Sequence, residues 1–195
     1  MRPPPRPTKD DLANARDKTV PDIIAPGLKV LFCGINPGLY SGATGCHFAR
    51  PGNRFWPALH LGGFTPRQLA PYERKELLSC GLGITNVVMR TTAAAAELSN
   101  EELKEGVAAL RRKVLRYRPR YLAVLGLHAY RIGFRAKAAA VGEQPEHIGD
   151  TKVWLLPNPS GLNAHYQLPT LSAAFADLHK AADARSARRD SAGPR

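Results

Sequence analysis

Leu28-Lys29-Val30-Leu31-Phe32-Cys33, followed directly by Gly34-Ile35-Asn36-Pro37-Gly38, is the stretch of sequence that decides the fold. Its apolar run predicts a buried strand, and the glycine and proline residues after the run predict the loop that leaves that strand. A second stretch of the same kind, Lys152-Val153-Trp154-Leu155-Leu156, is followed by Asn158-Pro159-Ser160-Gly161-Leu162. Ligands bind outside the carboxyl ends of the strands in open α/β sheets, so we expect the two loops to form one site.

The rest of the sequence alternates strand-like and helix-like segments. Two more apolar runs, 84–88 and 121–125, bring the number of expected strands to four. Helices are expected at 53–62, from Thr65, at 73–80, from Ser99, after Gly126 and at 168–178, from caps, closing glycines or one apolar face. Strands separated by helices predict a mostly parallel sheet covered on both faces. The fold class is therefore α/β, a single-domain, three-layer α/β/α sandwich around a mostly parallel four-stranded sheet.

The two ends differ from the middle in composition. Residues 1–21 are rich in proline and charge, and residues 184–195 consist mainly of Arg, Ser, Ala and Gly. Both predict flexible basic tails that carry no site. Between them, residues 22–183 are long enough for one domain with a sizeable core.

Charge and cysteine content narrow the kinds of partner. The formal net charge of +12 favours a polyanion, nucleic acid before a membrane surface, although solubility together with basic tails also explains such a charge. Three cysteines without paired spacing predict a reducing compartment and argue against zinc or disulfides. We expect no membrane association, because no apolar run reaches the length of a span and Met1-Arg2-Pro3-Pro4-Pro5 does not resemble a signal peptide.

Neither loop carries a common catalytic motif. The Gly34 loop has neither GxGxxG nor GxxxxGKS/T, so a nucleotide-binding loop is not predicted. The absence of GxSxG, HExxH and paired carboxylates argues against the usual hydrolases, metalloproteases and glycosidases. What remains are Asn36 and Asn158. An asparagine amide does not titrate, but it can orient a water molecule or bind a polar heterocycle, which suits a reaction that needs positioning more than proton removal.

At these residues the chain resembles the mismatch-specific uracil-DNA glycosylases, bacterial relatives of thymine-DNA glycosylase within the uracil-DNA glycosylase superfamily. The resemblance extends from about Ile24 to Ala182 and rests on the order and spacing of short motifs. Besides the two loops, these motifs are Ala25-Pro26-Gly27-Leu28, Phe48 with Pro51-Gly52-Asn53-Arg54-Phe55-Trp56, Gly83-Ile84-Thr85, Arg90-Thr91-Thr92 and Glu97-Leu98-Ser99. The resemblance implies that superfamily's fold and an enzyme that flips uracil out of duplex DNA and hydrolyses its bond to deoxyribose.

The resemblance also implies which residues would bind the base and act on it. Asn36 would position the attacking water, and Asn158 would contact the base or the departing charge. Phe48 would be the aromatic floor under the base. The complete base-binding set implied in this way is Ile35, Gly38, Ser41 and Phe48.

A further set of residues would contact the DNA. Leu162 would be a wedge that fills the space left by the flipped base, with the backbone of Gly161 and Asn163 close to the unpaired guanine. Ser160 would contact phosphates. His165 follows the wedge closely enough in the sequence to contact a phosphate as well.

Each of these roles has a structural alternative. Asn36 could stabilise a turn, since Asn before Pro is common in turns. Phe48 could be an ordinary core aromatic, and Leu162 a packed loop residue. His165 could be an ordinary surface residue.

The chain departs from the efficient, uracil-specific branch of the superfamily, which has Asp in the first motif and His at the start of the second. Asn36 and Asn158 stand at these positions, so we expect modest turnover. Asn86 stands where some close relatives carry Lys. Ala93, in the tract Ala93-Ala94-Ala95-Ala96, could mark the place of a carboxylate that assists water in other relatives. A small-residue loop without a catalytic role is the alternative.

The sequence and the resemblance together predict a mismatch-specific uracil-DNA glycosylase without a metal or organic cofactor. We expect it to act as a monomer on double-stranded DNA that contains uracil or a mismatched pyrimidine, in the bacterial cytoplasm at the nucleoid. Thymine and other damaged pyrimidines remain open as substrates. Two alternatives remain: a protein that binds mismatched or damaged DNA without cleaving it, and a small-molecule enzyme with a Rossmann-like sheet.

Overall fold

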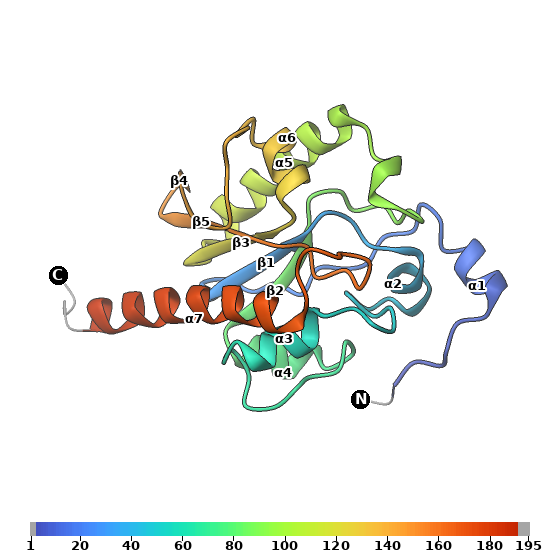
Figure 1. Ribbon diagram of the computed structural model, residues 1–195, viewed down its shortest axis with the longest axis horizontal. Helices are drawn as coiled ribbons and strands as arrows, with labels where there is room; N and C mark the ends of the chain where they lie inside the picture. The colour runs from blue at the N-terminus through green and yellow to red at the C-terminus, as the bar shows by residue number, and fades with distance from the viewer. Residues whose placement is uncertain (1–2, 191–195) are drawn as a thin grey trace.

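The alternating side chains of strand β1 (Val30–Gly34) explain the layers of the fold. In the computed structural model, which describes residues 3–190, every residue of this strand is buried. Val30 and Phe32 pack into one apolar cluster, whereas Leu31 and Cys33 pack into another. Successive side chains of a strand point to opposite faces, so a strand buried in this way needs helices on both sides of its sheet (Figure 1).

The sheet contains five strands in the order β2-β1-β3-β5-β4. Parallel pairing joins β1 to β2 (Leu82–Asn86) and to β3 (Tyr121–Leu125), and joins β3 to β5 (Thr151–Leu156). These are the four strands that the sequence predicted. Strand β4 (Gly142–Ile148) is an addition, paired antiparallel with β5 at the edge.

The sequence of β4 explains why it was not predicted. Its seven residues include Pro145 and the charged Glu143 and Glu146, which disfavour a strand in the middle of a sheet. At an edge, proline is tolerated because one side of the strand needs no ladder partner. The pairing with β5 shifts register between Glu143 and His147, around this proline.

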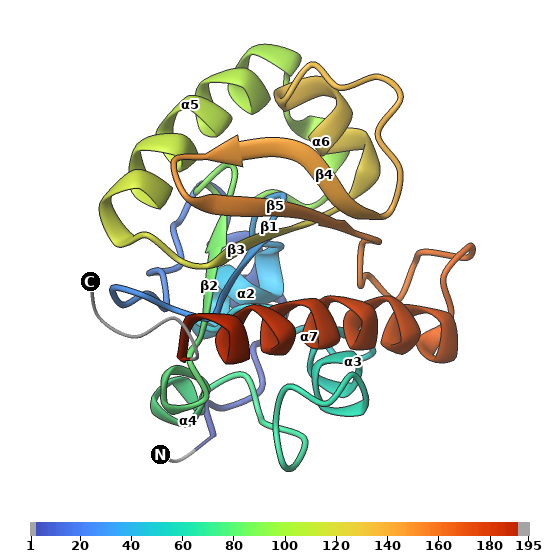
Figure 2. The same ribbon diagram turned by 90° about the vertical axis from the view of Figure 1, so that its left-hand side faces the viewer.

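Two layers of helices cover the sheet (Figure 2). One layer packs against Phe32 and its neighbours and consists of α3 (Phe55–Leu61), α4 (Arg74–Ser79) and α7 (Leu168–Asp190). The other packs against Leu31 and consists of α5 (Asn100–Tyr117) and α6 (Leu127–Gly133). Shorter helices are α1 (Lys9–Ala13), α2 (Leu39–Thr44) and the 3₁₀ turn η1 (Ala95–Glu97). The three-layer α/β/α architecture is as predicted.

Local signals predicted one helix start correctly and another wrongly. Ser99 caps α5 through the predicted capping box with Glu102. No helix begins at Thr65, because its hydroxyl donates to the carbonyl of Arg67 instead of accepting from an amide. Arg67 in turn pairs with Glu73, so the polar groups of this segment are satisfied in a loop.

The ends of the described chain carry more structure than their composition indicated. The N-terminal segment forms α1 and buries Ala15 and Val20 completely. At the other end, α7 continues to Asp190, and residues 191–195 of the predicted tail lie outside the described residues. Within residues 3–190, none of the helices combines the length and apolar character needed to cross a bilayer. Cys33, Cys46 and Cys80 are free thiols.

Candidate functional site

A cavity of about 460 Å³ lies where the sheet presents the carboxyl ends of its parallel strands. Gly34 of β1, Asn86 of β2 and Leu125 of β3 contribute to its wall. The structure brings most of the predicted site residues into the lining: Ile35, Asn36, Gly38, Ser41, Phe48, Ala93, Asn158, Ser160 and Leu162. Gly161, Asn163 and His165 belong to the same loop as Leu162 but are not among the lining residues.

Gly126 allows the two loops to approach each other across β3, which lies between β1 and β5. Its φ of 137° is one that side-chain-bearing residues rarely adopt. A Cβ atom added here would lie 3.0 Å from Cδ1 of Ile35 and 4.0 Å from Cβ of Asn158. The site therefore depends on a third strand end, that of β3, where no sequence motif indicated a role.

The amide of Asn36 is held in one orientation. Its Nδ2 donates to Oγ1 of Thr92 at 2.7 Å, to the carbonyl of Arg90 at 3.1 Å and, less closely, to the carbonyl of Pro37 at 3.3 Å. The Thr92 hydroxyl donates its own proton to the carbonyl of Ala94, so its oxygen is left to accept from Asn36. These acceptors fix the NH₂ end and leave Oδ1, an acceptor, as the end available to the cavity.

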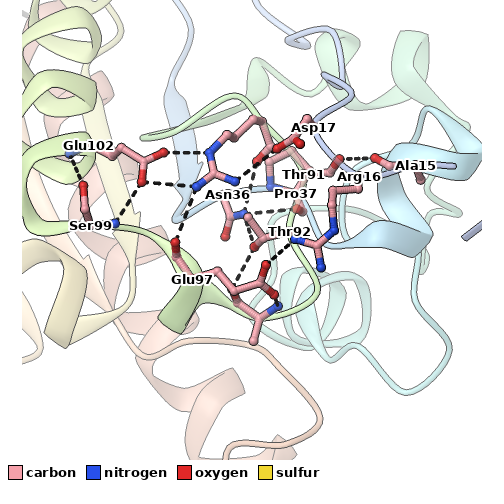
Figure 3. A network of polar contacts seen from close by, with 12 residues as sticks. Ala15, Arg16, Asp17, Asn36, Pro37, Thr91, Thr92, Glu97, Ser99 and Glu102 are labelled. Atoms are coloured by element: carbon pink, nitrogen blue, oxygen red, sulfur yellow. Dashed lines mark hydrogen bonds and ion pairs between the residues drawn. The ribbon is translucent and has the colours of Figure 1, made fainter. Parts of the chain in front are cut away.

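The N-terminal segment holds the stretch after β2 that contains Thr91 and Thr92, the latter bound to Asn36 (Figure 3). Thr91 donates through its hydroxyl to the carbonyl of Ala15 and through its amide to the carbonyl of Lys18 at 2.8 Å. The amide of Asp17 donates back to the carbonyl of Thr91 at 3.1 Å. Leu12 reaches the cavity wall. This segment therefore contributes to the site, which its composition did not predict.

Ion pairs also hold the N-terminal segment against the segment that contains Thr91. Arg90 pairs with Glu102 at 2.6 Å and with Asp17 at 3.2 Å, and Arg16 pairs with Glu97 at 2.7 Å. The Arg90 pair holds the pKa of Glu102 at about 2. Because these groups are partly exposed, each pair contributes little alone, but together they connect α5, the Thr91 segment and the N-terminal segment.

A buried pair, His47 and Asn86, forms another part of the wall and was not predicted. Nε2 of His47 lies 3.0 Å from the carbonyl of Pro21, an acceptor, so Nε2 carries the proton. Nδ1 of His47 is then an acceptor, and Nδ2 of Asn86 donates to it at 3.3 Å. Oδ1 of Asn86 consequently points toward Gly34, where an added Cβ would approach it to 2.5 Å. The available signal was the place of Asn86 at the end of a strand beside β1.

Burial lowers the pKa of His47 to about 4, although the Pro21 carbonyl opposes that shift. Below about pH 6.5 unfolded His47 takes up a proton and folded His47 does not, so the free energy of unfolding should fall as pH is lowered from about 6.5 to 4. The expected loss is about 3 kcal/mol, measurable by urea unfolding across this range. A His47→Gln variant should lose less free energy of unfolding over the same pH range. His179, whose pKa is also lowered by burial, provides a control. If the free energy of unfolding of His47→Gln depends on pH as steeply as that of wild type, while that of His179→Gln depends on it less, the effect does not come from His47.

Phe48 presents an aromatic face beside the cavity. Its ring stacks on that of Phe55, with centroids 4.2 Å apart and planes inclined by 23°. Its φ of 52° is left-handed, and its Cζ would lie 3.2 Å from a Cβ added to Gly34. The close approach to a glycine fixes the ring against the end of β1, so Phe48 is at once a partly buried core aromatic and part of the cavity wall.

The Asn158 loop is shaped by its own polar groups. Oδ1 of Asn158 accepts from the amide of Ser160 at 3.0 Å, and its carbonyl accepts from Nδ2 of Asn163 at 3.0 Å. The side-chain NH₂ of Asn158 is therefore the end left for the cavity. Leu162, beyond this turn, is 78% exposed, so it is not a packed loop residue.

The chemistry available in the cavity is that of neutral polar groups. Among the described residues, no carboxylate lines it, and no cluster of three or more His, Cys, Asp or Glu side chains could hold a metal ion. Arg50 at the exposed surface is the one cation of the lining within residues 3–190. Amide oxygens, amide NH₂ groups and an aromatic face can bind and orient a planar heterocycle and a water molecule.

Comparison with known proteins agrees with the fold and names a family. The sequence profile of the uracil DNA glycosylase superfamily matches residues 21–180. The solution structure of a protein from Methanosarcina acetivorans, proposed to be a uracil DNA glycosylase, is similar with a TM-score of 0.54. The two chains are 19% identical, and the match covers 84% of this chain and 98% of the other.

Proposed function

The chain belongs to the uracil DNA glycosylase superfamily, and from this premise we propose that it removes uracil from G·U mismatches in duplex DNA and leaves an abasic site. The observation that carries the proposal is the fixed amide of Asn36, which presents an acceptor to a cavity beside the ring of Phe48. A water molecule and a stacked pyrimidine are the two reactants that such a pair suits.

In the proposed reaction, a flipped uracil lies against Phe48 while Oδ1 of Asn36 accepts a hydrogen bond from a water molecule. The bond between C1′ of deoxyribose and N1 of uracil breaks, and its electron pair leaves with the base. Oxygen of the water forms the new bond to C1′ and releases its proton to solvent. The NH₂ group of Asn158 would donate to the departing anion, an interaction that strengthens as charge develops. The backbone around Ile35, with Gly38 and Ser41, would bound the base.

Among the described residues that line the cavity, none is suited to remove the proton from water. His47 is neutral, and its two nitrogens are engaged by Pro21 and Asn86. General-base assistance is worth about 10²–10⁴-fold in rate. We therefore expect slow turnover that relies on positioning, with the weak pairing of a mismatch helping the base to leave the duplex.

DNA is the partner that the charge and the exposed loop favour. The net charge of +12 suits a phosphate backbone, and Ser160 and His165 would contact phosphates on either side of Leu162. One chain contains both a cavity and an exposed apolar side chain, so a monomer suffices. The protein would then act where chromosomal DNA is, in the bacterial cytoplasm.

Leu162→Ala should slow uracil release from a G·U duplex about tenfold while slowing release from single-stranded DNA less, because a wedge replaces stacking lost on base flipping. Single-turnover rates on the two substrates measure the ratio. Leu115→Ala is the matched control, since Leu115 is also an exposed leucine, at 52%, but lies on α5 outside the cavity lining. An equal loss on both substrates would contradict the wedge role.

The proposed activity is tested by incubating the protein with G·U, A·U and G·T duplexes and with single-stranded uracil DNA, then cleaving abasic sites with alkali. We expect strand breaks at uracil opposite guanine. Binding to these duplexes with no strand break in any of them would instead support a mismatch-binding protein without catalytic activity.

A further inference from the structure

Arg54 makes an unusual set of contacts with the loop of residues 158–167, called here the wedge loop. Its Nη2 donates to the carbonyls of Ser160 at 2.6 Å and Asn163 at 2.8 Å. Its Nη1 donates to the carbonyl of Tyr166 at 2.5 Å and to Oε1 of Gln167 at 3.2 Å. One side chain thus joins positions on both sides of Leu162.

The backbone at and before Arg54 also contacts the wedge loop. The amide of Arg54 donates to the carbonyl of Pro159 at 2.9 Å. A Cβ added to Gly161 would lie 2.7 Å from the carbonyl oxygen of Gly52, so the two backbones are nearly in contact. The segment 52–54 therefore packs directly against the first half of the wedge loop and fixes its backbone.

The contacts of Arg54 are not those of an ordinary ion pair. Within the described residues no carboxylate pairs with it, and its Nε is buried without a hydrogen-bond partner. Its positive charge is stabilised by backbone carbonyl oxygens, which belong to the loop itself. The planar fork of a guanidinium suits this use, because it directs several donors at fixed angles.

We propose that Arg54 is a positioning residue that holds the wedge loop, before DNA binds, in the conformation that presents Leu162 to the duplex. The proposal rests on the proposed function for the role of Leu162. An exposed loop that had to be ordered during base flipping would lose conformational entropy at that step, and a loop ordered in advance avoids this loss. Arg54 acts through the loop and does not contact the reacting atoms.

The test compares wild type with Arg54→Lys, which keeps the charge but loses the fork, and with Arg54→Gln, which loses both. We expect both variants to release uracil from a G·U duplex about tenfold more slowly, with less than about a threefold change on single-stranded DNA. Arg67→Gln is the charge-matched control for Arg54→Gln, because Arg67 pairs with Glu73 outside the wedge loop. It should match wild type in the ratio of the two rates. Wild-type behaviour of Arg54→Lys would overturn the proposal, since charge alone would then be sufficient.

A double-mutant cycle on the duplex separates positioning from a general loss of folding. If Arg54 acts by presenting Leu162, then Arg54→Lys combined with Leu162→Ala should be no slower than Leu162→Ala alone, within about threefold. Rates that multiply independently would overturn the proposal.

Hydrogen exchange tests the loop without relying on catalysis. The amides of Leu162, Asn163 and His165 donate within the wedge loop at 3.3, 3.0 and 3.1 Å. In Arg54→Lys these amides should exchange faster than in wild type, while those of α5 remain unchanged. Unchanged exchange in the loop would overturn the proposal. A wild-type protein that releases no base would contradict the proposed function, and the exchange result would still decide whether Arg54 orders the loop.

Discussion

Asn36→Ala is expected to release uracil from a G·U duplex about 10²–10³ times more slowly than wild type, because it removes the acceptor that orients water at the sugar carbon. The rate is measured in single turnover with excess protein, so that product release does not mask the chemical step. Affinity for the same duplex should change little, since Asn36 lies within the cavity and not on the wedge loop.

Asn36→Asp provides the control for orientation, since it preserves the shape of the side chain. Nδ2 of Asn36 faces three acceptors, the carbonyls of Arg90 and Pro37 and Oγ1 of Thr92. A carboxylate has no proton to donate to them, so it would be repelled from the place that the amide occupies. We therefore expect this variant also to be at least about tenfold slower than wild type. A faster Asn36→Asp enzyme would contradict the claim that these acceptors fix the amide.

The outcome for Asn36→Ala also distinguishes catalysis from a structural role. If Asn36 only stabilised its turn, the variant would lose stability and duplex affinity together with activity. Retained stability and affinity with a large loss in rate would support water positioning. A rate within about threefold of wild type would contradict it.

The parts of the fold that could be predicted are those that local sequence determines. The strands β1, β3 and β5 are continuous apolar runs, and a run buried on both faces has few alternatives. Strand β4 could not be recognised in this way, because it forms only against β5 and contains Pro145. The prediction of a helix from Thr65 was wrong because an ion pair between Arg67 and Glu73, which the capping signal does not include, keeps this segment in a loop.

The candidate site likewise contains residues that the sequence could identify and residues that only the fold brings together. Asn36 and Asn158 stand in motifs, so the sequence identified them, whereas the groups that orient them come from distant segments. Thr92 and Ala15 are ordinary residues in the sequence, and their part in holding Asn36 appears only when the N-terminal segment packs against Thr91. The tautomer of His47 likewise depends on the carbonyl of Pro21.

Ala93→Asp is expected to raise the single-turnover rate of uracil release by about 10²-fold, because it would place a general base in a cavity whose described lining residues supply none. Ala93 is exposed and lines the cavity directly after Thr92, whose hydroxyl accepts from Asn36. A carboxylate here would follow Thr92, the residue that accepts from the amide that orients the water. The gain should appear with rising pH as the new carboxylate ionises, near pH 4 for an unperturbed aspartate.

Ala96→Asp is the matched control, since it adds the same charge to the same alanine tract but at a position outside the cavity lining. Both variants make the protein less positive by one unit, so both should weaken DNA binding slightly. Only Ala93→Asp should accelerate base release. If it does not, or if Ala96→Asp accelerates release equally, the alanine tract is a small-residue loop without a catalytic position, and the slow rate must be attributed to the two asparagines alone.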